Sequence, residues 1–257
     1  MHEEAGTSVF AKIGVDRLTS DWLRTEQRVY AALRGDFMPQ VRAWDAGERP
    51  LSLLEDLSAC RWPPPWDRAG VDRVLAALAE LRAADPRGVL PPLSVADRDL
   101  AGSWRRVAAA PAQFLSLGLA TAGRLCGSAA ALIGAAESAD LDGPCPTHQD
   151  VRSDNLCFGQ GRALLVDWNL AVLAHPDVDI AFWLPSLHAE GGPAPEEILP
   201  AAAPLAAVIS GFFAERAGKP PIPTAPGVRR VQREQLRTAL PWAVRALGLA
   251  PLDGPAP

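Results

Sequence analysis

The stretch that decides the fold runs from Thr147 to Ile180 and reads THQDVRSDNLCFGQGRALLVDWNLAVLAHPDVDI. It combines a dense set of acids and amides with short apolar runs that are typical of strands. We expect strands over Leu156–Phe158 and Ala163–Val166, joined by the turn Gly159–Gln160–Gly161. A polar loop precedes this hairpin and an acidic loop follows it.

The outer ends of the hairpin carry side chains that can bind a cation. Asn155 precedes the first strand and Asp167 follows the second, and a hairpin brings such positions side by side. One carboxylate and one amide oxygen suit Mg²⁺, which prefers a few protein ligands plus substrate phosphates to a complete protein cage. Asp150 lies on the preceding loop, where it could accept a proton from a hydroxyl that attacks a metal-bound phosphate. The stretch therefore predicts phosphoryl transfer.

This stretch resembles the catalytic core of the aminoglycoside phosphotransferase and choline kinase superfamily, small-molecule kinases with a protein-kinase-like fold. That family carries an H-G-D-x-x-x-x-N loop followed by an aspartate and an aromatic residue, and the corresponding residues here are His148, Asp150, Asn155, Asp167 and Trp168. The resemblance implies Asp150 as the catalytic aspartate, with Asn155 and Asp167 as magnesium ligands. It also implies that His148 is a structural residue that braces the loop.

Four other residues of the stretch bear on the resemblance. Gln149 replaces the common glycine and Asn169 stands where many relatives have an acid, but neither change removes a catalytic group. Asp179 resembles the family's aspartate downstream of the metal site, which has a mainly structural role there. Arg152 is expected to form a local ion pair, because the kinase-like loop does not need it for chemistry.

The amino-terminal part supplies a lysine and a glutamate in the order of a kinase. Lys12, one of two lysines in the chain, lies in an apolar alternation that predicts a strand over Ser8–Ile13. Helical spacing predicts a helix over Ser20–Leu33, capped by Ser20 or Asp21, with Glu26 in its middle. In kinases the strand lysine holds the α- and β-phosphates and the helix glutamate orients it. The alternative is a lysine at a strand edge and a solvated glutamate.

The segments around this helix complete a small lobe. Further strands are expected over Gln40–Ala46 and Leu51–Leu54. By resemblance, the next residues form the linker in which related kinases hold adenine through backbone groups, so Glu55 and Leu57 are expected to bind the nucleotide. Gly6 is the one glycine before Lys12, where relatives have two strands and a glycine-containing turn over the phosphates. We therefore expect a short or truncated amino-terminal lobe.

The expected fold class is α+β, a protein-kinase-like fold with two lobes. We expect a nucleotide-binding lobe of sheet and helix over residues 1–57, a mostly helical lobe with the catalytic loop over 58–250, and a disordered tail over 251–257. Apolar spacing and Gly/Pro breaks predict the helices of the larger lobe. Their expected ranges are 69–84, 95–109, 112–136, 180–188, 196–217 and 227–247.

Composition excludes several classes of protein. The chain has 257 residues, 48% of them hydrophobic, and a net charge of −5 without an extended basic surface, which argues against a nucleic-acid partner. Its four cysteines are irregularly spaced, and we find neither a secretory signal nor an apolar run of about 18 residues. We expect a cytoplasmic protein without a membrane anchor, and the sequence leaves its oligomeric state open.

Two functions remain open, whereas a zinc site and a metal-dependent hydrolase are disfavoured. We expect ATP-dependent transfer of the γ-phosphate to a hydroxyl of a small molecule, with ATP and Mg²⁺ as cofactors and no indication of which acceptor. The alternative is a catalytically impaired kinase-like binding or regulatory module without a full phosphate-covering loop. A zinc site built from Cys60, Cys145, His148 and Cys157 would lack a second close ligand pair beside Cys145 and His148. A metal-dependent hydrolase built on His148, Asp150, His175, Asp177 and Asp179 would leave the hairpin spacing and the pair of Lys12 and Glu26 unexplained.

Overall fold

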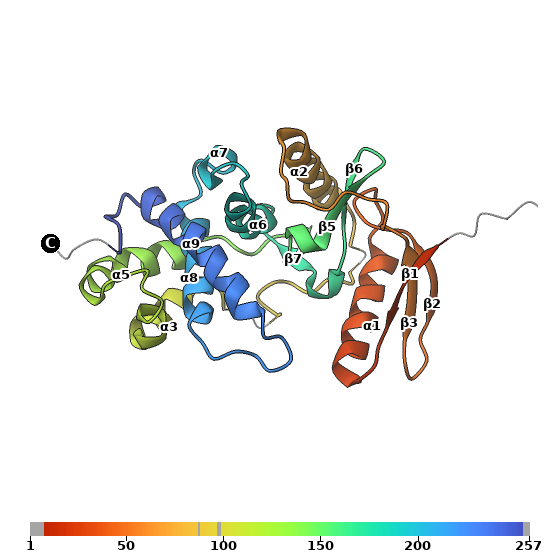
Figure 1. Cartoon of the computed structure of the whole chain (residues 1–257), viewed down its shortest axis with the longest axis horizontal. Helices are drawn as coiled ribbons and strands as arrows, with labels where there is room; N and C mark the ends of the chain where they lie inside the picture. The colour runs from red at the N-terminus through yellow and green to blue at the C-terminus, as the bar shows by residue number, and fades with distance from the viewer. Residues whose placement is uncertain (1–7, 87, 97–98, 254–257) are drawn as a thin grey trace, which may run out of the picture. The chain divides into compact units, whose positions relative to one another are not determined.

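A computed structural model of the chain describes residues 8–86, 88–96 and 99–253 (Figure 1). The chain passes through two compact units, and each is built from two separate segments. Residues up to 92 together with 143–179 form unit 1, and residues 93–142 together with those from 180 onward form unit 2. Unit 1 thus contains residues from both predicted lobes. The predicted boundary between residues 57 and 58 stays a prediction.

A three-stranded antiparallel sheet opens unit 1, as the alternating apolar residues predict. Its strands are β1 (Val9–Ile13), β2 (Val41–Asp45) and β3 (Leu51–Glu55), in the order β1-β3-β2. Side chains alternate between the two faces of a strand, so Phe10 and Lys12 share one face of β1. The small sheet and its helix agree with the predicted α+β fold.

Helix α1 (Arg17–Ala32) starts earlier than predicted. Its cap is Asp16, whose side chain accepts a hydrogen bond from the Thr19 N–H at 2.8 Å, while the Thr19 hydroxyl accepts one from the Asp16 N–H. This reciprocal pair satisfies two amides at the helix start. The predicted caps, Ser20 and Asp21, are therefore wrong and lie inside the helix.

The predicted catalytic hairpin is present in unit 1. It consists of β5 (Leu156–Gly159) and β6 (Arg162–Leu165), which pair in antiparallel fashion. The two residues between them, Gln160 and Gly161, have φ values of +52° and +79°. Two successive positive φ values give the type of two-residue turn whose twist matches that of paired strands.

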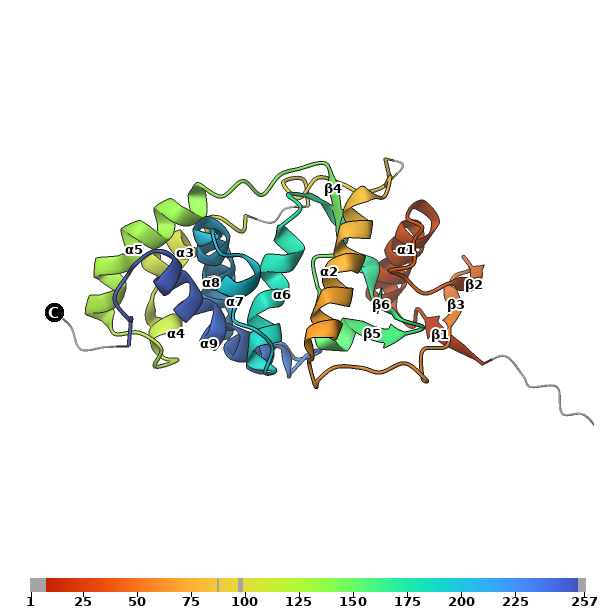
Figure 2. The ribbon, with the colours of Figure 1, turned by 90° about the horizontal axis from the view of Figure 1, so that it is seen from above.

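A second, shorter strand pair flanks the catalytic loop. Strand β4 (Cys145–Thr147) pairs with β7 (Val172–Ala174), and the sequence did not predict either strand because three residues are too few to show an alternation. Helix α2 (Arg68–Ala83) packs against β4 and β6 (Figure 2). The catalytic loop therefore begins at the end of β4, in one antiparallel pair, and ends at the start of β5, in another.

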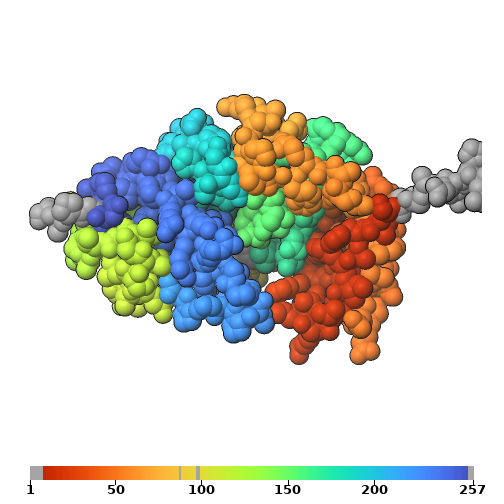
Figure 3. Space-filling model, in the orientation of Figure 1, coloured from red at the N-terminus to blue at the C-terminus, as the bar shows by residue number. Residues whose placement is uncertain are grey.

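Unit 2 is made of helices. Its central helix is apolar around most of its circumference, as expected for a helix surrounded by neighbours, and packs against α3, α5 and α9. In the space-filling view α9 (blue) forms much of the visible side of this unit (Figure 3). The helices are α3 (Ser103–Ala109), α4 (Ala112–Leu115), α5 (Ala122–Glu137), α6 (Val178–Ala189, which begins in unit 1), α7 (Pro195–Ile198), the central α8 (Ala203–Ala217) and α9 (Val228–Ala246).

Three of the predicted helices are shorter or interrupted. The helix predicted over 112–136 breaks at Gly118, whose φ is +71°, and restarts after Thr121, whose side chain caps α5. The helix predicted over 196–217 is divided into α7 and α8 by the segment 199–202, which contains a proline. The helix predicted over 95–109 begins only at Ser103. Apolar spacing continued across these breaks and concealed them.

The carboxyl-terminal segment remains in contact with unit 2 as far as it is described. Leu252 is buried, and its carbonyl accepts a hydrogen bond from the Thr121 N–H at 2.8 Å. Residues 254–257 of the predicted disordered tail lie outside the described residues, as does Gly6. Within the described ranges, no helix is long and apolar enough to cross a membrane.

Candidate active site

The predicted lysine–glutamate pair is formed in unit 1. Lys12 Nζ donates to Glu26 Oε1 at 2.9 Å and to Oε2 at 2.8 Å, and it also lies 3.1 Å from Asp167 Oδ1. Glu26 is only 2% exposed, so the alternative of a solvated glutamate is wrong. Burial lowers the pKa of Lys12, but the charges of Glu26 and Asp167 outweigh it and the pKa is raised. Lys12 is therefore a fixed cation that joins the sheet, α1 and the second acidic loop.

The two ends of the hairpin lie side by side, as predicted. The Val166 N–H donates to the Asn155 carbonyl at 2.9 Å, which extends the hairpin by one pair and brings Asp167 next to Asn155 in the cavity wall. The Asn155 side chain turns toward the loop, where its Nδ2 donates to the Asp150 carbonyl at 3.0 Å and to Asp150 Oδ2 at 2.9 Å. These bonds use the amide nitrogen and leave Asn155 Oδ1 for another ligand.

His148 braces the loop from inside the core. The Asp150 N–H donates to His148 Nδ1 at 3.3 Å, so the ring proton lies on Nε2 and is donated to the Val166 carbonyl at 2.9 Å. Burial lowers the pKa of His148 more than nearby Asp179 raises it, in agreement with a neutral ring. Asp179 accepts the N–H groups of His148 and Gln149 at 2.7 and 2.8 Å.

Gln149 shows why glycine is common at its position. Its φ is +69°, in the left-handed region that costs a residue with a Cβ roughly 1–2 kcal/mol. The buried Gln149 side chain donates from Nε2 to Thr147 Oγ1 at 3.0 Å, and Thr147 in turn donates to the Val172 carbonyl. Asp167 also has a left-handed backbone, with φ +71°. Strained backbone at both acidic loops is typical of a functional site.

Asp150 is a partly buried carboxylate, with 33% of its side chain exposed. Burial raises its pKa, and the charge of Arg152 opposes this effect. Arg152 Nε lies 3.1 Å from Asp150 Oδ1, and Arg152 Nη2 donates to Asp154 Oδ2 at 3.0 Å. The expected local ion pair of Arg152 is therefore confirmed, and one of its partners is Asp150.

A cavity of about 520 Å³ opens beside these groups, and all of its lining residues belong to unit 1. This volume is within the usual range for a site that binds a small molecule or cofactor. Five of the predicted site residues line it, namely Lys12, Glu55, Leu57, Asn155 and Asp167. The structure thus brings the predicted lysine, linker and hairpin residues to one cavity.

Apolar side chains that the sequence analysis missed also line the cavity. Phe10 lies two residues before Lys12, on the same face of β1, and Pro39 and Trp62 are further wall residues. The strand alternation that identified Lys12 could have identified Phe10, because residues two apart share a face. Trp62 lies in a proline-rich segment without periodicity and offered no such signal.

The sequence profile of the phosphotransferase enzyme family matches residues 4–212. The chain belongs to this family. A solved structure also resembles the chain, that of a thermostable mutant of aminoglycoside phosphotransferase APH(4)-Ia in a ternary complex with ADP and hygromycin B. The TM-score is 0.55 at 15% identity, and the match covers 95% of this chain and 87% of the other. None of the curated proteins is a significant match.

These comparisons confirm the kinase-like fold of this phosphotransferase, with a small sheet and helix in its amino-terminal part and a mostly helical carboxyl-terminal part. At 15% identity the solved structure bears on the fold alone. The roles of individual residues in the phosphotransferase therefore depend on the geometry of its own site.

The linker of this phosphotransferase is held by its side chains. Glu55 Oε2 accepts the Gln40 N–H at 3.1 Å, and Glu55 Oε1 lies 3.6 Å from Arg162 in β6. Leu57 packs in an apolar cluster with Cys157 and Leu164 of the hairpin. Glu55 is the last residue of β3, and both side chains anchor this segment to its surroundings.

The chemistry of the donors fits a magnesium ion that is completed by phosphate oxygens. Asn155 Oδ1 is not used by the bonds to Asp150, and the Asp167 side chain is 47% exposed, with Lys12 in contact with Oδ1 only. In the part of the chain that the structure describes, no three His, Cys, Asp or Glu side chains are grouped to hold a metal. A carboxylate oxygen and an amide oxygen are ligands that suit Mg²⁺ when phosphate oxygens complete its coordination, so the chemistry of these two side chains fits that ion.

The acids of the hydrolase alternative are engaged elsewhere. Asp179 is buried and accepts two amides of the catalytic loop. The Asp177 N–H donates to His175 Nδ1 at 3.2 Å, and the Asp177 carboxylate lies 3.9 Å from Arg82. These contacts hold the loop after β7 and do not converge with Asp150 on one centre.

Proposed function

We propose that this chain is an ATP-dependent phosphotransferase that transfers the γ-phosphate to a hydroxyl group of a small molecule. The observation that carries the proposal is the position of Lys12, which contacts Glu26 and Asp167 at the wall of the cavity. A lysine oriented by a helix glutamate beside an aspartate is the arrangement that holds nucleotide phosphates in kinases. Membership of the phosphotransferase enzyme family supports the same reaction.

The cavity offers separate surfaces for the parts of a nucleotide. Phe10 provides an aromatic face for the base, and the backbone of the linker at Glu55 and Leu57 provides polar groups for its edge. Lys12 provides the charge for the phosphates. The solved relative is described with ADP bound, which supports ATP as the donor here.

Asn155 and Asp167 are the proposed ligands of Mg²⁺, through Asn155 Oδ1 and the Asp167 carboxylate. A Mg²⁺ ion held there would neutralise the negative charge that develops during transfer. Lys12 lies 3.1 Å from Asp167, so its charge orients the carboxylate and compensates part of the negative charge of the site. Asn155 directly precedes β5 and Asp167 follows β6, so the pairing of these strands sets the distance between the two residues.

Asp150 is the proposed acceptor of the hydroxyl proton. As the acceptor oxygen bonds to the γ-phosphorus, its proton passes to the Asp150 carboxylate, the bond from the γ-phosphorus to the bridging oxygen breaks, and ADP leaves. The raised pKa of Asp150 makes it a better base than an ordinary aspartate. Asn155 and His148 hold the carboxylate and the backbone of Asp150, respectively.

The class of acceptor that we propose is broader than the antibiotic named for the solved structure. That protein is described with hygromycin B bound, and at 15% identity its acceptor is not carried over to this chain. We propose a hydroxylated small molecule, with antibiotics and hydroxylated metabolites as the compounds to test.

The Asp150→Asn variant tests the proposal against the alternative of a binding module. The substitution is nearly isosteric, so MgATP binding and the melting temperature should be retained while transfer falls by about 10²–10⁴-fold. Wild type and variant are incubated with MgATP and a panel of hydroxylated compounds, ADP release is followed, and phosphorylated product is identified by mass spectrometry. Product from wild type alone supports the enzyme. MgATP binding by wild type without product from any acceptor supports the binding module.

A further inference from the structure

The two oxygens of the Asp150 carboxylate are held in different ways. Oδ2 accepts an aligned hydrogen bond from Asn155 Nδ2 at 2.9 Å. Oδ1 lies 3.1 Å from Arg152 Nε, but this contact lacks the alignment of a hydrogen bond, and the buried Arg152 Nε has no hydrogen-bond partner among the described residues. Oδ1 therefore keeps both of its lone pairs available for a proton donor, whereas Oδ2 already shares one with Asn155.

Hydrogen bonding alone does not explain the orientation of the Arg152 side chain. A buried donor without a partner costs about 1–3 kcal/mol, so a purely structural arginine would be expected to turn its Nε to an acceptor or to water. Instead the Arg152 side chain is 27% exposed, and its guanidinium spans two acids, with Nη2 on Asp154 and Nε beside Asp150. Within the described ranges, Arg152 is the one cation that forms an ion pair with Asp150.

We propose that Arg152 is a positioning residue that fixes the plane of the Asp150 carboxylate and keeps Oδ1 directed at the acceptor hydroxyl. This inference rests on the proposed function and adds a residue to it. If Asn155 were its one partner, the Asp150 carboxylate could rotate about the hydrogen bond that Oδ2 accepts. The charge of Arg152 beside the opposite oxygen restricts that rotation.

The guanidinium suits this task better than an ammonium group would. It is planar, it presents several donors in a fixed arrangement, and Asp154 holds one end of it while the other end remains beside Asp150. The expectation that the loop does not need Arg152 for chemistry is thereby revised, because its ion pair involves the proposed base.

Kinetics of Arg152 variants test the role, with Arg68→Ala as the matched control. Arg68 forms an exposed ion pair with Asp72 at 3.0 Å on α2, away from the cavity lining. Arg152→Ala should lower kcat by about 10²-fold, the cost of misplacing a reacting group, and leave KM for MgATP within about twofold. Arg152→Lys should recover part of kcat, and Arg68→Ala should match wild type.

Two kinetic results would overturn the inference. One is a kcat of Arg152→Ala that equals that of Arg68→Ala. The other is a parallel loss of kcat, MgATP affinity and melting temperature in both Arg152→Ala and Arg152→Lys, which is the pattern of a structural role. A loss confined to kcat, with partial rescue by lysine, supports positioning.

Crystal structures of wild type and Arg152→Ala decide the question without relying on turnover. We expect the Asp150 carboxylate to turn about its Oδ2 contact in the variant while Asn155 and Asp167 stay in place. An unchanged carboxylate would overturn the inference even if the chain is an active kinase. If wild type phosphorylates no acceptor, the proposed function fails, and a turned carboxylate would still establish that Arg152 holds Asp150.

Discussion

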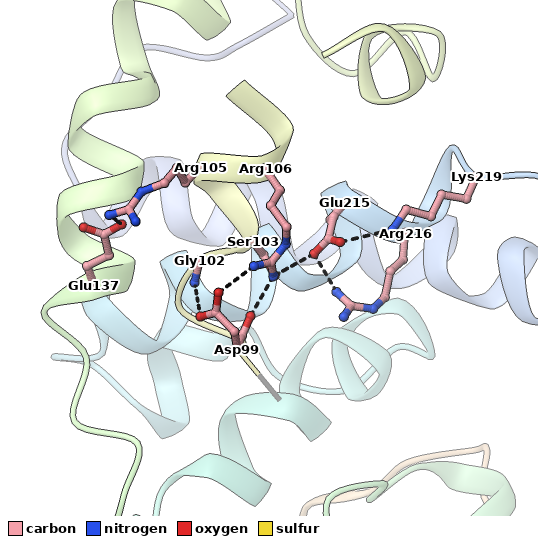
Figure 4. Close-up of polar contacts among 9 residues, drawn as sticks. All are labelled: Asp99, Gly102, Ser103, Arg105, Arg106, Glu137, Glu215, Arg216 and Lys219. Carbon is pink, nitrogen blue, oxygen red and sulfur yellow. Dashed lines mark hydrogen bonds and ion pairs between the residues drawn. The ribbon is translucent and has the colours of Figure 1, made fainter. Parts of the chain in front are cut away.

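Glu215 in α8 should stabilise unit 2 in a strongly pH-dependent way. Its side chain is 13% exposed, and its carboxylate accepts hydrogen bonds at 3.0–3.1 Å from four side chains, three of them cationic (Figure 4). The donors are Ser103, Arg106, Arg216 and Lys219. Burial alone raises the pKa of Glu215, but the bonds from Arg106 and Lys219 and the charge of Arg216 outweigh it and lower the pKa to about 2.

The contribution of Glu215 to the free energy of unfolding follows from the difference between its pKa in the folded protein and the ordinary pKa of a glutamate. A fall from 4.5 to about 2 corresponds to roughly 3.4 kcal/mol, at about 1.36 kcal/mol per pKa unit. The side chains of Arg106 and Lys219 are 40% and 38% exposed, so solvent screening reduces the contribution to about 1–2 kcal/mol. Because the folded pKa lies below the unfolded one, the contribution is complete above pH 4.5 and disappears as the pH falls toward 2.

Urea denaturation of Glu215→Gln and wild type at a series of pH values measures this contribution. The free energy of unfolding of the variant should be about 1–2 kcal/mol lower at pH 7, and the difference should shrink between pH 4.5 and 2. Glu234→Gln is the control, because its ion pair with Arg230 is exposed and contributes less than about 0.5 kcal/mol. A difference for Glu215→Gln that is independent of pH, or no larger than that of Glu234→Gln, would refute the reasoning.

Three further results are expected at the candidate site. Asp167→Ala should weaken ATP binding by roughly tenfold or more in magnesium buffer, measured by calorimetry, because a charged contact of about 1.5–3 kcal/mol is lost. Lys12→Ala should lower turnover in steady-state kinetics through poor placement of ATP, and Glu26→Ala should do so more weakly. Phe10→Ala should weaken nucleotide binding in a titration by about 1–3 kcal/mol of lost stacking, whereas Val9→Ala on the other strand face should not.

Each of these expectations has an outcome that contradicts it. Equal MgATP affinity of wild type and Asp167→Ala would argue against the proposed ligand, and a chelator should abolish any difference between them. Unchanged nucleotide binding and turnover in both Lys12→Ala and Glu26→Ala would show that their pair does not place ATP. Equal effects of the substitutions at Phe10 and Val9 would exclude stacking on the base.

The parts of the site that the sequence predicts are those set by short-range geometry. Asn155 and Asp167 flank a hairpin whose turn and strands are visible in the eleven residues between them, so their proximity follows from the chain itself. Lys12 and Glu26 lie on one strand and the next helix, which also restricts their distance. The contact between Lys12 and Asp167 joins positions 155 residues apart and required the tertiary structure.

The features that could not be predicted from the sequence depend on the orientation of side chains or on several residues that are equally suited to one position. Asp16 caps α1 because Thr19 returns its hydrogen bond, whereas Ser20 and Asp21 are equally good cap residues by composition. Helix breaks in unit 2 occur within continuous apolar spacing, so periodicity alone extended those helices. The proximity of Arg152 to the Asp150 carboxylate depends on side-chain rotamers, which spacing does not determine.

The ring of His148 has a consequence for how the site moves. It is bonded on one side to the amide of Asp150 and on the other to the carbonyl of Val166, directly before Asp167. Because the five-membered ring is rigid, we expect a displacement of one loop to be passed through it to the other. The separation between Asp150 and Asp167 should then vary less than the position of either residue.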